Sequence, residues 1–354
     1  MQKQLADYKE AINRELAQFF SDLPNQLNLD LSDQGCDALE KIKEYSLRPG
    51  KRIRGALTCF AYDYATGEKQ GKSGLQTAVA LELIQNYLLI VDDVMDRSAL
   101  RRGKPTVHEL YLAEQVQNPK DQHLANMMAI NVGLITQHLV NLVLAEVDEK
   151  PEYVREALLL LHKNILATGF GQIDDASQHI EVPVSEADII RKYTLKSGYY
   201  TFVCPLQLGL VVGGKNDPKL LQEVTDFGLA AGIAFQLKDD MLGIFAAIED
   251  TGKPNTDDIE EGKYTLLMQY AFEHATPDDV HYLRQVLGVP QASAGTVEKV
   301  RNILENCGAK RYVEDTIKQY AEQARNSMQK SRFWDEAAKA TLVGIVDYSI
   351  QRQR

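Results

Sequence analysis

The chain has only four cysteines among its 354 residues, and none stands in a CxxC or His–Cys pattern. This scarcity argues against a disulfide framework or a zinc site and predicts reduced thiols in a cytoplasmic protein. The N-terminus lacks the apolar run that a signal peptide needs. The apolar stretch from 127 to 147 is interrupted by polar residues, so we expect a buried helix there and no transmembrane segment.

An excess of positive charge is also missing. The formal net charge is −11, which argues against a nucleic-acid-binding protein that relies on bulk charge. A small anionic substrate remains compatible with this charge, because a few local cations can dominate a cleft.

Runs of alternating apolar and polar residues, the mark of a sheet, are absent as well. Helical periodicity extends almost from end to end, and glycine and proline signals divide it into roughly ten or more helices. No low-complexity linker marks a boundary, and no repeat of fixed period occurs. We therefore predict an all-α helical bundle that forms a single domain over residues 1–354.

What the chain does contain is two acidic motifs, each with basic companions. The first, Asp92-Asp93-Val94-Met95-Asp96, ends an apolar helix expected from 79 to 96. At about 100° per residue, Asp92 and Asp96 lie about 40° apart on one face, and Gln85 lies within about 20° of the same line. Two carboxylates at this spacing repel each other unless a cation lies between them, and Mg²⁺ suits carboxylate ligands.

The motif alone fits a solvated helix end equally well. It is followed, however, by Arg101-Arg102-Gly103-Lys104, and the planar fork of arginine suits phosphate oxygens. A magnesium-bridged diphosphate would satisfy both the acids and the arginines.

The second motif, Asp239-Asp240, ends another apolar helix, which we expect to start near Phe227. Its fifth position is Gly243, so the carboxylate pair of the first motif is not repeated. Two lysines follow, Lys253 on a loop and Lys263 at the start of the next helix. A lone loop lysine is usually solvated, but lysines beside an acidic motif are candidates for binding phosphate.

Further cations stand in suggestive places. Lys51, Arg52 and Arg54 occupy a helix start, which favours anions. Lys196 lies in an apolar segment where an unpaired charge would be costly, so we expect it to reach a charged partner or ligand. A polar island whose role the sequence does not determine consists of Gln172, Asp174 and Asp175.

In order along the chain, the motifs are GKRIR, LELIQ, DDVMD, RRGKPTVH, GQIDD, LKSGYYTF, FQLKDD and GKPNTDDIEEGK. This series resembles the trans-isoprenyl diphosphate synthases, the polyprenyl synthetase family, from about Tyr45 to Leu267 in motifs. The resemblance implies an isoprenoid synthase-like all-α bundle around a deep central cavity, Mg²⁺ as cofactor, and a homodimer. It implies the head-to-tail condensation of isopentenyl diphosphate with allylic diphosphates.

The resemblance also implies roles for individual residues. Metal binding falls to Asp92, Asp93, Asp96, Asp239 and Asp240. Contacts with the allylic diphosphate fall to Arg101, Lys196, Ser197, Gln236 and Lys253. Isopentenyl diphosphate would be held by Lys51, Arg54, Gln85 and Arg102, with Lys263 assisting at a closing loop. The residues that would carry catalysis are Asp92, Asp96, Arg101, Lys196, Asp239 and Lys253.

Three positions depart from the family's frequent pattern. Gln85 stands where histidine is frequent, Ser197 where threonine is usual, and Gly243 where many second motifs have an aspartate. Glutamine and serine keep hydrogen-bonding groups, and members resembling archaeal geranylgeranyl synthases share the glycine. These departures therefore do not predict a loss of activity.

Product length would depend on the side chains just before Asp92. On an ideal helix Leu88 lies about 40° from Asp92 and Tyr87 about 140° away, yet family members use both positions as the floor. The resemblance therefore implies geranylgeranyl diphosphate as product, with farnesyl diphosphate as the alternative. Tyr87 is equally compatible with a packed core aromatic.

Two other protein classes fit this sequence less well. A terpene cyclase should carry an Asn/Ser/Glu metal motif on a late helix, where this chain has FQLKDD followed by lysines. A non-catalytic regulatory subunit of a heteromeric synthase should have lost acids or cations, and almost all are present here.

Overall fold

The structure is a computed structural model. It describes residues 2–115, 121–178, 183–246, 257–290 and 292–351. Contacts group the chain into two compact units. The N-terminal unit comprises Gln2–Leu159 and Pro205–Lys215, and the C-terminal unit comprises Leu160–Cys204 and Asn216–Arg354. The single domain over residues 1–354 stays a prediction.

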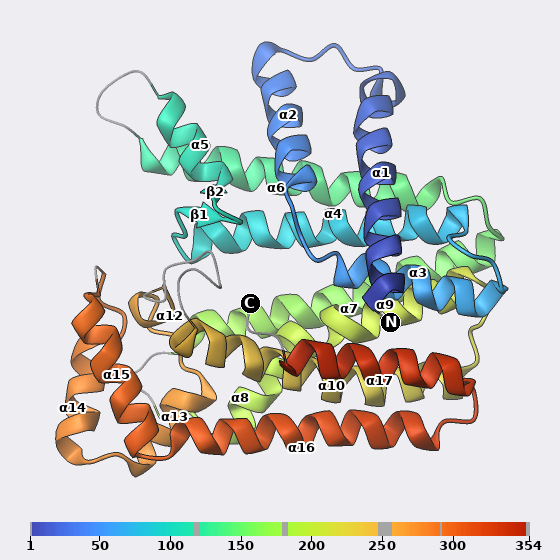
Figure 1. Cartoon of the computed structure of the whole chain (residues 1–354). Coiled ribbons are helices and arrows are strands. Elements are labelled where there is room, and N and C mark those ends of the chain that lie inside the picture. Colours follow the sequence, from blue (N-terminus) through green and yellow to red (C-terminus); the bar gives the residue numbers. More distant parts are fainter. Residues whose placement is uncertain (1, 116–120, 179–182, 247–256, 291, 352–354) are drawn as a thin grey trace. The chain divides into compact units, whose positions relative to one another are not determined.

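In the described residues of the N-terminal unit, the regular elements are helices and one small hairpin (Figure 1). Its elements are α1 (Gln2–Leu27), α2 (Asp33–Leu47), α3 (Ile53–Thr66), α4 (Lys72–Met95), β1 (Leu100–Arg101), β2 (Lys104–Pro105), α5 (Val107–Glu114) and α6 (Gln122–Ala145). The helices α7 (Pro151–Ser177) and α9 (Cys204–Val212) belong partly to each unit. Helix α4 is apolar on almost every side, and both α3 and α6 pack along it. The all-α prediction is confirmed.

Helices α4 and α6 are each long and apolar enough to cross a membrane, judged by length and composition alone. The most apolar segment of α4 is 61% buried inside the protein, whereas the most apolar segment of α6 is only 44% buried. The prediction of a buried helix from 127 to 147 therefore holds for one face of α6. The large apolar side chains on its exposed face are Leu124, Met127, Ile130, Leu134, Ile135 and Leu142.

The hairpin was not expected from the sequence. Strands β1 and β2 pair antiparallel, with Leu100 opposite Pro105 and Arg101 opposite Lys104. Between them Arg102 and Gly103 both have positive φ, 57° and 74°, the backbone of a tight hairpin turn. Two-residue strands are too short to produce an alternating pattern, so sequence periodicity could not reveal them.

The regular elements in the described residues of the C-terminal unit are all helices. Its further elements are α8 (Glu186–Tyr193), the π-helix η1 (Thr194–Val203), α10 (Pro218–Phe245), α12 (Asp257–Glu260), α13 (Leu266–His274), α14 (Pro277–Val286), α15 (Ala294–Asn306), α16 (Ala309–Lys330) and α17 (Glu336–Gln351). Helix α10 begins at Pro218, so the expected start near Phe227 was wrong. Asp217 caps it by accepting from the Lys219 N–H at 2.8 Å, and proline suits the first helical turn.

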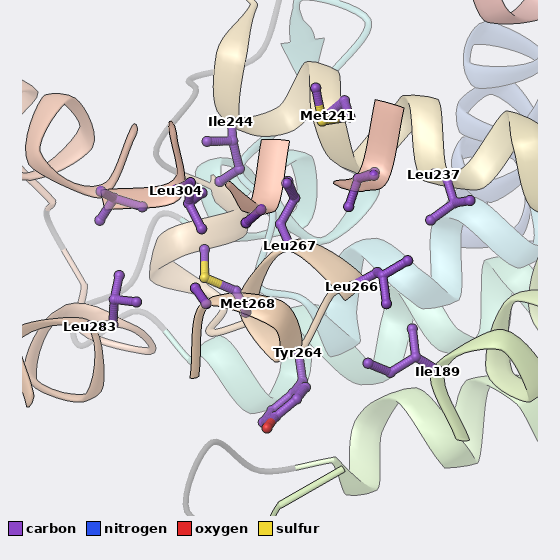
Figure 2. Packing of buried hydrophobic residues seen from close by; sticks show 14 of the residues in the cluster. Ile189, Leu237, Met241, Ile244, Tyr264, Leu266, Leu267, Met268, Leu283 and Leu304 are labelled. Atoms are coloured by element: carbon purple, nitrogen blue, oxygen red, sulfur yellow. The ribbon is translucent and has the colours of Figure 1, made fainter. Parts of the chain in front are cut away.

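The core of this unit gathers side chains from α8, α10, α13, α14, α15 and α16 (Figure 2). Leu237, Met241 and Ile244 line one face of α10 at spacings of three and four residues, as expected for an amphipathic contact. Leu266, Leu267 and Met268 come from the start of α13. This core therefore holds α10, which carries the second acidic motif, against α13.

Helices η1 and α10 approach each other closely at two glycines. A Cβ built on Gly232 would lie only 2.5 Å from the Cα of Gly198, so α10 does not tolerate a larger residue at position 232. Ser197 precedes this crossing point, and Gln236 lies one turn after it on α10. The π-helical form of η1 is a feature found often at functional sites.

Candidate functional site

The first acidic site lies at the C-terminal end of α4, in the N-terminal unit. The backbone N–H of Asp96 donates to the carbonyl of Asp92 at 2.8 Å, so the helical turn continues through the motif. Asp92 and Asp96 therefore share one helix face, as predicted, and both are partly buried.

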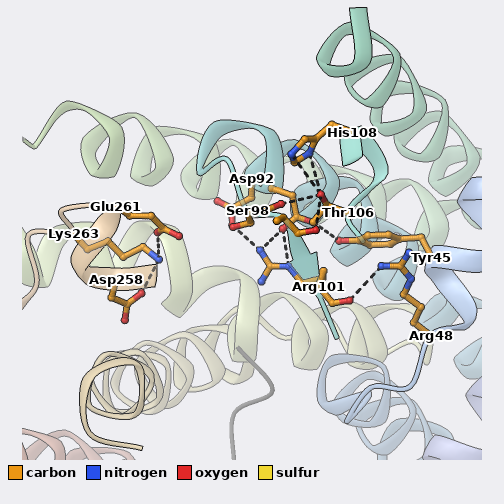
Figure 3. A network of polar contacts seen from close by, with 12 residues as sticks. Tyr45, Arg48, Asp92, Ser98, Arg101, Thr106, His108, Asp258, Glu261 and Lys263 are labelled. Atoms are coloured by element: carbon orange, nitrogen blue, oxygen red, sulfur yellow. Dashed lines mark hydrogen bonds and ion pairs between the residues drawn. The ribbon is translucent and has the colours of Figure 1, made fainter. Parts of the chain in front are cut away.

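Asp93, between them, is completely buried, and on the helix it lies about 100° from Asp92 and about 60° from Asp96. The Tyr45 hydroxyl donates to its Oδ2 at 2.8 Å, and Arg101 donates from Nε to its Oδ1 at 2.7 Å and from a second nitrogen (Figure 3). Burial by itself would lower the pKa of Arg101, but the charge of Asp93 outweighs it and the pKa is raised. Asp93 thus fixes a fully charged guanidinium, which also lies 3.9 Å from Asp92 Oδ2. Both oxygens of Asp93 are engaged, and its predicted role as a metal ligand stays a prediction.

The hairpin that carries Arg101 is fastened to α2. Arg48 donates to the carbonyl oxygens of Arg101 at 3.3 Å and Pro105 at 2.9 Å. On the other side, the Thr106 hydroxyl donates to the Ser98 carbonyl at 2.8 Å. These contacts explain how a sheet of two very short strands can hold Arg101, a predicted catalytic residue, in a defined place.

The cations at the start of α3 divide into two groups. Arg52 is buried, and its guanidinium lies 2.9 Å from Glu82 Oε2, so it is a structural residue. Lys51 is exposed and Arg54 is half-buried. The guanidinium of Arg102 lies over Gly50, 3.3 Å from where a Cβ would be. The structure therefore brings Arg102 beside the Lys51 segment, as the predicted grouping of these two cations requires.

Gln85, Tyr87 and Leu88 are all half-buried on α4. A Cβ built on Gly133 of α6 would lie 3.7 Å from Cδ2 of Tyr87. Tyr87 therefore lies within ordinary van der Waals range of this position on α6, whereas the atom closest to that Cβ would be Cγ2 of Val91 at 3.0 Å. The role of Tyr87 and Leu88 as a floor stays a prediction.

The second acidic site lies on α10, in the C-terminal unit. Asp240 is buried and accepts from Gln236 Nε2 at 2.9 Å and from the Tyr193 hydroxyl. Gln236 in turn accepts from the Ser197 hydroxyl at 2.6 Å. Burial raises the pKa of Asp240 to about 7, and the nearby charge of Asp258 adds to this. A carboxylate kept so far from water favours a cation beside it.

Lys196 has the charged partner that the sequence led us to expect. Its Nζ lies 2.5 Å from Asp175 Oδ2, and Nζ of Lys192 lies 2.9 Å from Asp175 Oδ1. Lys192 also donates to the Tyr264 carbonyl at 3.0 Å. Asp175 therefore anchors two lysines, which answers the question of its role that the sequence left open.

The remaining predicted residues of this unit are Asp239 and Lys263. Asp239 is partly buried one residue before Asp240. The prediction that Lys263 starts a helix was wrong, because it lies between α12 and α13, which begins at Leu266. Its Nζ lies 3.0 Å from Asp258 Oδ1 and 2.5 Å from Glu261 Oε2 (Figure 3). Lys253 lies outside the described residues.

The donor set suits a hard divalent cation. Within the described part of the chain, no three His, Cys, Asp or Glu side chains are arranged to hold an ion by themselves. Mg²⁺ commonly binds one or two carboxylates and takes its other ligands from water and substrate phosphates. Asp92 with Asp96, and Asp239 with Asp240, are pairs of this kind.

A sequence profile of the polyprenyl synthetase family matches residues 36–304, most of the chain. The chain belongs to the polyprenyl synthetase family. It is 30% identical to the geranylgeranyl diphosphate synthase of Methanosarcina mazei, with 86% of each chain covered. It is 26% identical to the enzyme of the same name from Saccharolobus solfataricus, over 96% of this chain and 99% of that one.

Its fold is that of a solved synthase from the family. The geranylgeranyl pyrophosphate synthase of Corynebacterium glutamicum, in complex with isoprenyl diphosphate and magnesium, aligns with a TM-score of 0.89 at 27% identity. The alignment covers 98% of this chain and 99% of that one. The predicted isoprenoid synthase-like fold is thereby confirmed.

Several residues of this polyprenyl synthetase escaped the sequence reasoning. They are Tyr45, Glu82, Lys192, Tyr193 and Asp258. Tyrosine, glutamate and lysine on helices are too common to signal a site by themselves. Glu82 and its partner Arg52 are 30 residues apart in the chain, and Lys192 and its partner Tyr264 are 72 apart, so only the folded structure pairs them.

Proposed function

We propose that this protein is a Mg²⁺-dependent prenyltransferase that condenses isopentenyl diphosphate with allylic diphosphates, with geranylgeranyl diphosphate as its main product. The observation that carries the proposal is the family match together with the Asp93–Arg101 pair. That pair presents a fixed guanidinium beside Asp92, which is the arrangement needed for a metal-bound diphosphate.

In the N-terminal unit, Arg101 would hold diphosphate oxygens while Asp92 and Asp96 hold metal. Mg²⁺ would supply charge neutralisation for the diphosphate as it leaves the allylic carbon. Lys51, Arg54, Gln85 and Arg102 would hold isopentenyl diphosphate. Because Arg101 is already fixed by Asp93, which the Tyr45 hydroxyl holds in turn, little reorganisation is needed when negative charge develops.

In the C-terminal unit, Lys196, Ser197 and Gln236 would bind the allylic diphosphate, and Asp239 and Asp240 would hold metal. The hydrogen bonds from Ser197 to Gln236 and from Gln236 to Asp240 place these three side chains in one connected network. Lys263 and Lys253 would add positive charge. The allylic carbocation is attacked by the double bond of isopentenyl diphosphate, and the released diphosphate accepts the proton, so no histidine base is required.

The test is to incubate the purified protein with Mg²⁺, isopentenyl diphosphate and dimethylallyl, geranyl or farnesyl diphosphate in turn, and to size the products by mass spectrometry. Products that stop at twenty carbons support the proposal. Products that stop at fifteen keep the chemistry but favour farnesyl diphosphate. No condensation with any primer contradicts a catalytic role and favours a regulatory subunit.

We also propose that the protein is a cytoplasmic homodimer. The exposed face of α6 supports a dimer, because Met127, Ile130 and Leu134 recur at three- and four-residue spacing and are 40–47% exposed. Light scattering coupled to size exclusion should give twice the chain mass of 39.7 kDa. The double variant Met127→Glu/Leu134→Glu should give a monomer, whereas Val289→Glu, at another exposed apolar side chain, should remain dimeric. A wild-type monomer would contradict this part of the proposal.

A further inference from the structure

The second acidic motif lacks a side chain at its fifth position. Asp239 and Gly243 are four residues apart on α10, so they lie about 40° apart on one face. The first motif has carboxylates at both corresponding positions, Asp92 and Asp96. The second motif therefore lacks, at Gly243, the carboxylate that the first motif has at Asp96.

That place is filled by a carboxylate from another element. A Cβ built on Gly243 would overlap Oδ2 of Asp258 and lie 2.8 Å from its Cγ. Asp258 belongs to α12, which follows α10 in the chain. Its carboxylate thus occupies the space that an aspartate side chain at position 243 would need.

Asp258 is held firmly in this place. Its carbonyl oxygen accepts from the Lys263 backbone N–H at 3.2 Å, and its Oδ1 lies 3.0 Å from Lys263 Nζ. Its side chain is only 18% exposed.

We propose that Asp258 supplies the carboxylate that position 243 lacks, and so completes the second acidic motif as an oxygen acceptor for the hydrated divalent cation. This inference rests on the proposed function. It also explains the glycine, since any side chain at position 243 would displace Asp258. A purely structural alternative is that Asp258 serves only to hold Lys263.

The two alternatives differ in what a carboxylate moved onto α10 should do. Asp258→Ser should weaken Mn²⁺ binding roughly tenfold, as loss of an outer-shell metal partner does. Gly243→Asp alone should also weaken it, because two carboxylates then compete for one space. The double variant Gly243→Asp/Asp258→Ser returns a single carboxylate to that space and should recover most of the affinity.

Binding is measured without turnover, by titrating the full-length protein separately with Mn²⁺, followed by electron paramagnetic resonance, and with inorganic diphosphate, followed by calorimetry. Glu260→Gln is the matched control on α12, since Glu260 accepts from the Ala292 N–H instead, and should change neither affinity. Lys263→Met should weaken diphosphate binding more than Mn²⁺ binding. Circular dichroism and thermal unfolding confirm that each variant is folded.

The inference is overturned if Asp258→Ser leaves Mn²⁺ affinity unchanged, if the double variant does not recover it, or if Asp258→Ser merely reproduces the Lys263→Met pattern. Asp239→Ala separates this outcome from failure of the proposed function. If Asp239→Ala weakens Mn²⁺ binding and Asp258→Ser does not, only the role of Asp258 is wrong. If the wild-type protein condenses no primer, the proposed function is wrong whatever Asp258 does.

Discussion

Nζ of Lys196 lies 2.5 Å from Oδ2 of Asp175, so the lysine proposed to bind substrate diphosphate is held in place by an acid of its own chain. Asp175 shares its second oxygen with Lys192 at 2.9 Å. Burial alone would raise the pKa of Asp175, but the two lysines hold it well below its usual range. Asp175 therefore remains ionised and keeps both cations charged.

Asp175→Asn should lower the free energy of unfolding by about 3 kcal/mol at pH 7, because it leaves two lysines beside each other without their counter-charge. A depressed folded-state pKa stabilises the protein above the ordinary pKa of 3.8, and this stability is lost as pH falls below it. The difference between wild type and variant should therefore shrink in urea-unfolding curves below pH 3.8.

The matched control is Asp174→Asn. Asp174 lies 3.7 Å from Arg191, which is 58% exposed, and such surface pairs contribute little. A loss of stability equal to that of Asp175→Asn would show that the buried lysines are not the cause.

Arg101→Lys should reduce kcat/KM roughly 10–100-fold, the equivalent of one charge-assisted hydrogen bond. The reason is geometric: Asp93 accepts from two nitrogens of the guanidinium, and a lysine ammonium cannot reproduce that fork. Steady-state kinetics with the allylic substrate varied would measure the loss. Lys104→Ala, which removes an exposed lysine paired with Glu44 at 2.7 Å, should leave kcat/KM unchanged.

Arg52→Met should destabilise the protein by roughly 3–5 kcal/mol, because it leaves the buried Glu82 carboxylate without its partner. Arg52→Met/Glu82→Leu should be more stable than Arg52→Met, since both charges are then removed. Chemical denaturation of both variants would check this order. Lys51→Met, at the exposed neighbour, should keep wild-type stability and raise KM for isopentenyl diphosphate. If Lys51→Met destabilised the protein as much as Arg52→Met, the assignment of a structural role to Arg52 alone would be wrong.

Tyr87→Ala should lengthen the products beyond twenty carbons if the ring limits the growing chain, because it removes bulk between α4 and α6. Tyr87→Phe keeps that bulk and should give wild-type products. Mass spectrometry of products made from farnesyl diphosphate distinguishes the two. An unchanged product length with Tyr87→Ala would make Tyr87 a packing residue only.

Helical periodicity and the order of the motifs were enough to predict the all-α fold and the family, because both are local properties of the chain. The shared face of Asp92 and Asp96 followed from helix geometry alone. The start of α10 at Pro218 was missed because its first turns, Pro218 to Asp226, carry more polar residues than the motif-bearing half.

Tertiary structure decided what each charged residue does. The sequence shows Arg52 and Lys51 as neighbours of equal charge, yet folding buries one against Glu82 and leaves the other exposed. In the same way it buries Asp93 against Tyr45 and Arg101, and it brings Asp258 into the space left by Gly243. The sequence determines the charge and hydrogen-bonding groups of each residue. Which distant residues interact is decided by packing, because hydrogen bonds and ion pairs form only between groups within a few ångströms of each other.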